Sequence, residues 1–298
     1  MAMRTLPWAL VCVSAMAGCA DSRPSGFVGP ASFIGAGDIA LCGTRPASES
    51  TAVRTAALLA ANPTAAVFAL GDNVYDSGTV IEYRDCYGPT WGAFRDRTYP
   101  APGNHEYQTP AADGYFAYFG AQAGPDRRGY YSFDLGSWHI VSLNSNIDAV
   151  AGSPQQAWLR ADLAAHRGQR CTLAYWHPPV FSSSSVHGND SKMADIWQTL
   201  QQFGADVVLA GHDHGYERFA PQTFDATPDA QHGLREFVVG TGGATPYAFA
   251  APQPSSEVRI ENTYGVLRFA LREGSYEWEF LPVAANGSWD SGQALCND

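Results

Sequence analysis

The feature that most constrains the fold is a series of short apolar segments separated by more polar stretches. Runs of this length, several of them rich in Val, Ile, Phe and Tyr, predict buried β-strands. Helical patterns lie between several of the runs, so we expect an α/β fold in which a sheet is covered on both faces. The apolar segments are residues 31–36, 65–70, 137–143, 171–176, 205–210 and 235–239.

The clearest helix signal begins at Ser153. Pro154 takes the first helical position, and Gln156 completes a capping box before the run 157–166. The other predicted elements are helices at 50–61 and 190–203 and a β-hairpin over 264–283 that turns near Gly274.

Four of the predicted strands are followed directly by a side chain that can bind a metal ion or act as an acid or base. In open α/β sheets, ligands bind in the loops after the carboxyl ends of the strands. We therefore expect these side chains to meet at one edge of the fold. They are Asp38, Asp72, His177 and His212.

Five short motifs contain these and related residues. Taken singly they are weak, because a Gly-Asp pair is usually a turn and a histidine before two prolines is often a buried structural residue. Together, their carboxylate, phenol, amide and imidazole groups suit Fe, Zn or Mn rather than calcium, which binds through oxygen alone. The motifs are Gly37-Asp38, Gly71-Asp72-Asn73-Val74-Tyr75, Gly103-Asn104-His105-Glu106, Trp176-His177 and Gly211-His212-Asp213-His214.

Residues 1–19 have a cationic start, a short apolar run and small residues before Cys19. This pattern predicts a lipoprotein-type signal peptide, with Cys19 as the acylated first residue of the mature chain. Ordinary signal cleavage or an uncleaved anchor is the alternative. Residues 20–30 are rich in Ser, Pro and Gly and predict a flexible tether, and residues 31–298 are expected to form one catalytic domain.

Four cysteines remain outside the leader once Cys19 is set aside. An even number in an exported chain indicates two disulfides, and of the three possible pairings we favour Cys42 with Cys86 and Cys171 with Cys296. A thiolate metal site is disfavoured, because no two of these cysteines have the close spacing typical of zinc sites.

The formal net charge is -11, from 29 acidic and 18 basic residues, and there is no basic run. This composition argues against binding to nucleic acid or electrostatically to an anionic membrane surface. Membrane contact is expected only through the lipid anchor, and an anionic ligand would need local positive charge.

The five motifs, in this order, resemble those of the purple acid phosphatases within the calcineurin-like metallophosphoesterase superfamily. The resemblance spans essentially the whole mature chain. Most superfamily members have a histidine two residues after the first aspartate, whereas this chain has Ala40 there and gains Tyr75 three residues after the second aspartate. The resemblance implies a four-layer α/β fold: two mixed sheets packed as a sandwich, with helices on both outer faces.

The resemblance also implies a dinuclear metal centre with Fe(III) in one position and divalent Zn, Fe or Mn in the other. Phenolate is a hard anionic donor that favours Fe(III), whereas neutral amide and imidazole groups suit the divalent ion. The centre would be positively charged, so an acidic protein could still bind phosphate. The implied ligands are Asp38, Tyr75 and His214 for Fe(III), Asn104, His177 and His212 for the divalent ion, and Asp72 as the bridge.

The implied activity is hydrolysis of small phosphate monoesters by water activated at the two ions. His105, which follows Asn104, and His187, on the Ser-rich loop 181–189, are the catalytic candidates; a solvated loop histidine is the alternative for His187. A phosphodiesterase or nucleotidase with the same metals remains a rival, as does a non-catalytic surface binding protein, although no ligand is missing. Residues near the motifs without an assigned role are Glu106, Asp213, Tyr216, Arg218 and the loop Thr241-Gly242-Gly243.

Overall fold

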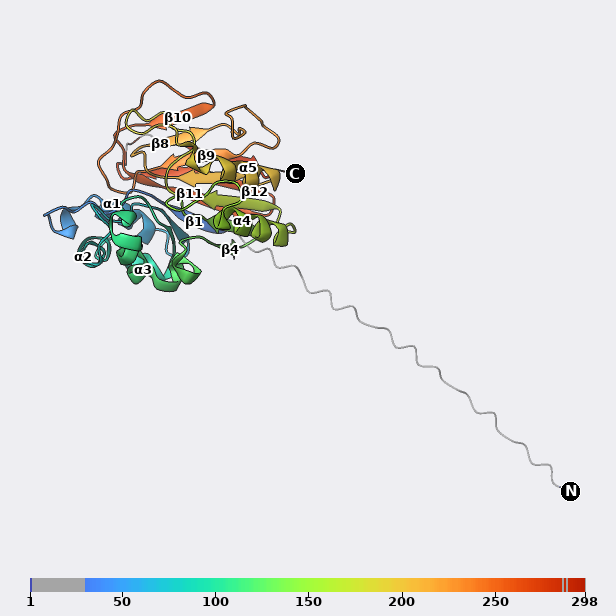
Figure 1. The fold of residues 1–298 in the computed structure, drawn as a ribbon, viewed down its shortest axis with the longest axis horizontal. Coiled ribbons are helices and arrows are strands. Elements are labelled where there is room, and N and C mark those ends of the chain that lie inside the picture. The colour runs from blue at the N-terminus through green and yellow to red at the C-terminus, as the bar shows by residue number, and fades with distance from the viewer. Residues whose placement is uncertain (2–29, 286, 288, 298) are drawn as a thin grey trace.

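The structure is a computed structural model that describes Met1 and residues 30–285, 287 and 289–297. The predicted signal peptide apart from Met1, Cys19 included, and the tether apart from Pro30 lie outside the described residues. Two mixed β-sheets face each other (Figure 1). The first has the order β13-β12-β11-β1-β2-β3, formed by Ser291–Leu295, Ser275–Pro282, Gly265–Arg272, Ala31–Ala36, Ala66–Leu70 and Thr98–Ala101. The second has the order β10-β8-β9-β7-β6-β5-β4, formed by Ser256–Ile260, Tyr216–Phe219, Arg235–Val239, Val207–Ala210, Cys171–Tyr175, Trp138–Ser142 and Tyr131–Leu135.

Aromatic side chains fill the space between the sheets. Phe33 on β1 lies 6.2 Å, centroid to centroid, from Tyr175 on β6, and Phe269 on β11 lies 5.3 Å from Phe237 on β9. All four rings are fully buried. Each such ring removes a large apolar area from water, so these contacts hold the two sheets together.

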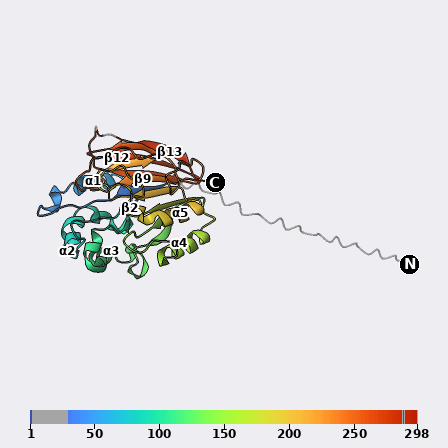
Figure 2. The same cartoon turned by 45° about the horizontal axis from the view of Figure 1, so that its top comes forward.

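Helices also pack against both sheets, and Figure 2 shows α4 and α5 lying together in a second view. On the seven-stranded sheet, Leu159 of α4 (Pro154–Ala165) and Leu200 of α5 (Ala194–Gln202) belong to a second apolar cluster with Val208 of β7. The helix α1 (Ala52–Ala60) packs against β11 of the other sheet. The predicted four-layer fold is thus confirmed.

The remaining helical segments are short and lie mainly beyond the β3 edge. Tyr115 of α3 (Asp113–Phe119), for example, donates a hydrogen bond to the Pro100 carbonyl of β3 at 3.0 Å. Among the described helices, none is long and apolar enough to cross a membrane. The other short segments are α2 (Val80–Glu82), η1 (Ala47–Glu49), η2 (Tyr83–Tyr87), η3 (Trp91–Arg97), η4 (Glu106–Gln108), η5 (Pro110–Ala112), η6 (Gly120–Ala123), η7 (Pro125–Arg127) and η8 (Ser191–Met193).

The capping box predicted for α4 is wrong in one partner. Ser153 accepts a hydrogen bond from the Gln156 amide as expected, at 3.2 Å. The Gln156 side chain, however, accepts from the amide of Gly152 at 2.7 Å rather than from that of Ser153. The reason is that the Ser153 amide is already donated to the carbonyl of Val150 at 3.0 Å.

Two disulfides join distant parts of the chain in the pairing favoured from the sequence. Cys42 is bonded to Cys86, with 5.9 Å between the Cα atoms, and Cys171 at the start of β6 is bonded to Cys296 after β13, with 5.6 Å. The second bond links the two sheets covalently. Cross-links that close long loops stabilise small proteins by about 2–5 kcal/mol, mainly by restricting the unfolded chain.

Candidate metal centre

The carboxyl ends of β1, β2, β6 and β7 bring the predicted ligands together. β1 pairs in parallel with β2, and β6 with β7, so each pair delivers its following loop to the same edge. Asp38, Asp72 and His212 all have positive φ angles, of 58°, 46° and 69°. This left-handed conformation is costly for residues other than glycine, and it concentrates at functional sites.

Glycines next to these residues allow a close approach of the loops. A Cβ atom on Gly103 would lie 2.1 Å from Oδ1 of Asp72, and one on Gly211 would lie 2.6 Å from Oδ2 of Asp38. Both distances are far below van der Waals contact. The two positions therefore need glycine for the carboxylates to sit where they do.

One group of donor atoms forms around the Tyr75 phenol oxygen. It lies 2.9 Å from Oδ1 of Asp38 and 3.2 Å from Nε2 of His214. The same His214 nitrogen is 3.4 Å from Oδ1 of Asp38. The structure thus places together the three side chains predicted to bind Fe(III).

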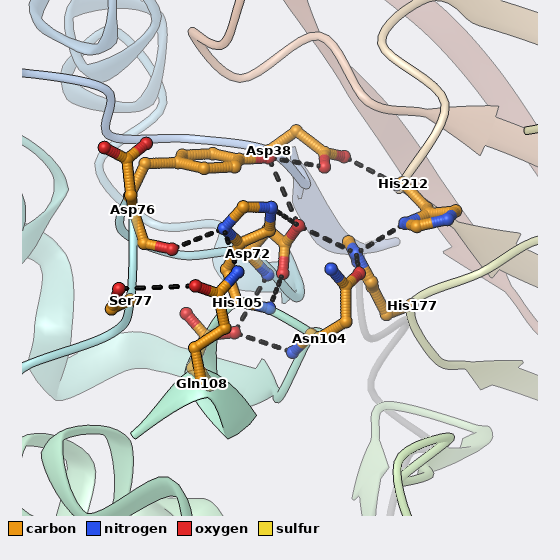
Figure 3. A network of polar contacts seen from close by, with 12 residues as sticks. Asp38, Asp72, Asp76, Ser77, Asn104, His105, Gln108, His177 and His212 are labelled. Atoms are coloured by element: carbon orange, nitrogen blue, oxygen red, sulfur yellow. Dashed lines mark hydrogen bonds and ion pairs between the residues drawn. The ribbon is translucent and has the colours of Figure 1, made fainter. Parts of the chain in front are cut away.

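A second group of donor atoms forms around Nε2 of His177 (Figure 3). This nitrogen lies 3.1 Å from Oδ1 of Asn104 and 3.2 Å from Nδ1 of His212. These are the three side chains predicted to bind the divalent ion.

Asp72 lies between the two groups. Its Oδ2 atom is 3.3 Å from the Tyr75 phenol oxygen and 3.1 Å from Nε2 of His177. Asp72, His177 and His212 each place a donor atom within 4.8 Å of the others. A single carboxylate oxygen is therefore shared by both groups, as a bridging ligand would be.

The donor set fits two metal ions. Donor atoms that bind one ion at about 2.1 Å lie roughly 3 Å apart, which is the spacing found in both groups. Nδ1 of His177 is 2.7 Å from the carbonyl of Leu70, and Nδ1 of His214 is 2.7 Å from that of Thr245. If these nitrogens are the protonated ones, both Nε2 atoms keep a lone pair directed into the cluster.

Burial and neighbouring charges shift the pKa values of the ionisable groups at this site. Burial alone would lower the pKa of His177, but the charge of Asp72 outweighs it and raises that pKa to about 10. Burial and the nearby carboxylates of Asp38 and Asp72 hold the pKa of Tyr75 well above its usual value. Binding of two cations would therefore displace protons from these side chains.

The two catalytic candidates both lie at this cluster. His105 places Nε2 3.8 Å from Oδ2 of Asp72, and its Nδ1 contacts the carbonyl of Asp76. The exposed side chain of His187 stacks on His212, with 4.1 Å between the ring centroids.

Two residues at the site had no role assigned from the sequence. Tyr247 stacks on His214, with 4.0 Å between the ring centroids. In the sequence, its position in the loop after β9 was the one feature that indicated a place near the site. Glu106 is fully buried and accepts hydrogen bonds from the amides of Asp72 (3.0 Å) and Gly103 (2.6 Å). It also accepts from the Asn73 amide at 2.9 Å. In the sequence, Glu106 could be recognised as a candidate by its place at the end of the motif Gly-Asn-His-Glu.

Two of the other unassigned residues share a structural partner. The Arg218 guanidinium and the Tyr216 hydroxyl both donate to Asp290, each at 2.7 Å. In the loop after β9, Gly242 donates its amide to the carbonyl of Gly37 at 2.9 Å and so packs against the segment that leads to Asp38. That contact supports the position of the segment before Asp38.

Comparison with known proteins agrees with this geometry. The family model "Calcineurin-like phosphoesterase" matches residues 33–216. Purple acid phosphatase 23 of Arabidopsis thaliana is 32% identical over 158 residues, which cover 45% of this chain and 34% of that protein. Purple acid phosphatase 21 of the same plant is 29% identical over 245 residues, or 71% of this chain and 55% of the relative.

Solved structures show the same fold. A purple acid phosphatase from yellow lupin (Lupinus luteus) seeds superposes with a TM-score of 0.70 at 19% identity, over 90% of this chain and 54% of the other. GAP50, described as the anchor in the inner membrane complex of Plasmodium, gives 0.67 at 11% identity, over 91% and 90%.

The matched region spans about a third of the length of the first curated relatives, from 27% to 36%. The resemblance to purple acid phosphatases stated from the motifs is confirmed. Because the family model covers more than half of the sequence, the chain belongs to the calcineurin-like phosphoesterase family.

Proposed function

We propose that the chain hydrolyses small phosphate monoesters at a dinuclear centre of Fe(III) and a divalent ion, of Zn, Fe or Mn. The observation that supports this most is the shared position of Asp72 Oδ2, within 3.3 Å of a donor atom in each group. The fold alone does not decide function, since a neighbour described as an anchor shares it. The complete donor set favours the enzyme over a binding protein.

When bound, two such ions would activate water, hold phosphate oxygens and stabilise the charge that develops during in-line displacement. The side chains of the protein would orient the reacting groups and donate or accept protons. His105 is held through Nδ1 by the Asp76 carbonyl, which turns Nε2 towards Asp72. His187, exposed and stacked on His212, is the group that can donate a proton to the leaving oxygen of the ester.

The identity of the first metal is tested by colour. Tyrosinate bound to Fe(III) absorbs visible light, so iron-loaded protein is expected to be coloured and Tyr75→Phe colourless. The substitution removes only an oxygen from a side chain whose ring is already buried, so the fold is expected to persist. A visible absorption spectrum with an iron assay checks this; an iron-replete, colourless wild type would count against Fe(III) at Tyr75.

For His187→Ala we expect a decrease in kcat of about 10²-fold or more, since a positioned general acid typically contributes 10²–10⁴-fold. Metal content should stay unchanged, because the side chain is exposed and stacks on His212 without belonging to either donor group. Ser185→Ala, a substitution in the same loop, is the control. Full activity of His187→Ala would remove this histidine from the mechanism.

The rival substrate class is separated by a direct comparison. We expect kcat/KM for an aryl phosphate monoester to exceed that for the corresponding diester on the same metal-loaded protein. A strong preference for the diester would replace the monoester proposal with a phosphodiesterase, while leaving the metal centre as proposed.

We further propose that residues 31–298 form the catalytic domain outside the cytoplasm, anchored through an acylated Cys19. The two disulfides support export, because such bonds persist in oxidising compartments. Mass spectrometry of the mature N-terminus tests the anchor: a diacylglycerol-modified Cys19 is expected, and an unmodified N-terminus elsewhere would contradict it.

A further inference from the structure

A second cluster of histidine and aspartate side chains lies where α4 ends over the β4–β5 hairpin. Asp134 and His139 are directly opposite each other in the pairing of β4 with β5. His166 is the residue that follows the last turn of α4, and its ring stacks on that of His139, with 3.9 Å between centroids and 16° between planes.

A single residue, Asp162, orients both imidazole rings. Its Oδ2 atom lies 2.8 Å from Nε2 of His139, and its backbone carbonyl lies 2.8 Å from Nδ1 of His166. The Ser132 hydroxyl donates to Oδ1 of the same carboxylate at 2.8 Å and so fixes its position. With these nitrogens protonated, Nδ1 of His139 and Nε2 of His166 remain as lone-pair donors.

Possible ligand atoms of the three residues lie close together. Nδ1 of His139 lies 3.2 Å from Oδ1 of Asp134. Asp134, His139 and His166 each place one ligand atom within 4.8 Å of the other two. We propose that these three residues bind a divalent transition-metal ion such as Zn²⁺, and that Asp162 is the carboxylate that positions both histidines.

The surroundings suit a cation that enters from solvent. The side chain of His139 is almost fully buried, at 1% exposure, but those of Asp134 and His166 are 49% and 33% exposed. Because Asp134 and His166 are accessible, a metal ion could reach buried His139 from solvent and keep bound water. The C-terminal end of α4 adds the negative end of the helix dipole, which favours positive charge.

This cluster is separate from the dinuclear centre. His139 pairs with Thr172 near the start of β6, whereas His177 follows the end of the same strand. Five residues of extended chain correspond to about 17 Å. The proposed ion would therefore occupy a site of its own, and its test does not depend on the activity proposed above.

The alternative is that His139 binds a proton in place of a metal ion. In that case His139 is an imidazolium ion held between Asp134 and Asp162, and the cluster serves only as an ion pair at the sheet edge. The two readings differ in the number of metal ions that the chain binds.

The test counts ions. Full-length protein with its dinuclear centre loaded is freed of excess metal by gel filtration, then titrated with ZnCl₂ by calorimetry and analysed by plasma mass spectrometry. We expect the wild type to bind one more Zn²⁺ per chain than either Asp134→Asn or His166→Ala. Asp162→Asn, which removes only the positioning carboxylate, should weaken this site by about 10- to 100-fold.

His232→Ala is the matched control, because His232 forms a similar surface pair with Asp229, 3.8 Å away, but no second histidine joins it among the described residues. It should retain the additional ion. The substituted side chains of Asp134 and His166 are partly exposed, so folded variants are expected, and their melting temperatures without added zinc verify this. Equal zinc binding by the wild type and both variants, or no additional ion in the wild type, would overturn the proposal.

Discussion

Asp72→Asn is expected to lower the affinity for both metal ions together and to reduce turnover by at least about 10³-fold. The reason is the position of its Oδ2 atom, 3.3 Å from the Tyr75 phenol oxygen and 3.1 Å from Nε2 of His177. An amide keeps the shape of the side chain but cannot present an anionic oxygen to two cations. Metal analysis and kcat/KM on the same preparation measure the effect.

Asp85→Asn is the control for this substitution. It is the same chemical change at a carboxylate that is 54% exposed and pairs with Arg84. Such exposed pairs contribute little, so metal content and activity should match the wild type. If Asp72→Asn kept two tightly bound ions, the shared carboxylate would not be a bridge.

Glu106→Ala is expected to lower the free energy of unfolding by about 3–5 kcal/mol. The substitution leaves the buried amides of Asp72, Asn73 and Gly103 without their acceptor, and each buried unsatisfied group costs about 1–3 kcal/mol. It also removes the acceptor of the Tyr83 hydroxyl, 3.1 Å away. Denaturant unfolding followed by circular dichroism measures the loss.

The conservative substitution separates hydrogen bonding from charge. Burial, together with the charge of Asp72, raises the pKa of Glu106 to about 7. Glu106→Gln should cost less than Glu106→Ala, because its amide oxygen still accepts. Glu279→Ala, which removes a half-exposed partner of Arg268, should change stability by under about 1 kcal/mol. A Glu106→Ala protein as stable as this control would contradict the role assigned to Glu106.

The strand-and-motif pattern predicted which side chains lie close together, because four of them follow strands whose ends meet at one edge. Apolar runs marked β1, β2, β6 and β7, and parallel pairing then brought Asp38 and Asp72, and likewise His177 and His212, to one edge. Tyr75 could be predicted only from the resemblance, since a tyrosine five residues past the end of a strand does not by itself indicate a metal ligand.

Other features could not be predicted because they depend on contacts between distant segments. Strand β13 is a polar sequence with alternating exposure that forms only because β12 offers it an edge. The β4–β5 hairpin and the end of α4 are unremarkable in sequence, yet they bring Asp134, His139 and His166 together. Glu106 was visible in its motif, but its hydrogen bonds to the loop at Asp72 and Asn73 follow from the three-dimensional arrangement alone.

The most direct measurement of the central claim is anomalous diffraction from crystals of the protein loaded with iron and zinc, recorded at both absorption edges. Two peaks are expected where β1, β2, β6 and β7 end, one of them at Tyr75 and specific for iron, with both ions about 2.0–2.2 Å from the carboxylate of Asp72. A single peak, or two peaks that do not share Asp72, would contradict this claim.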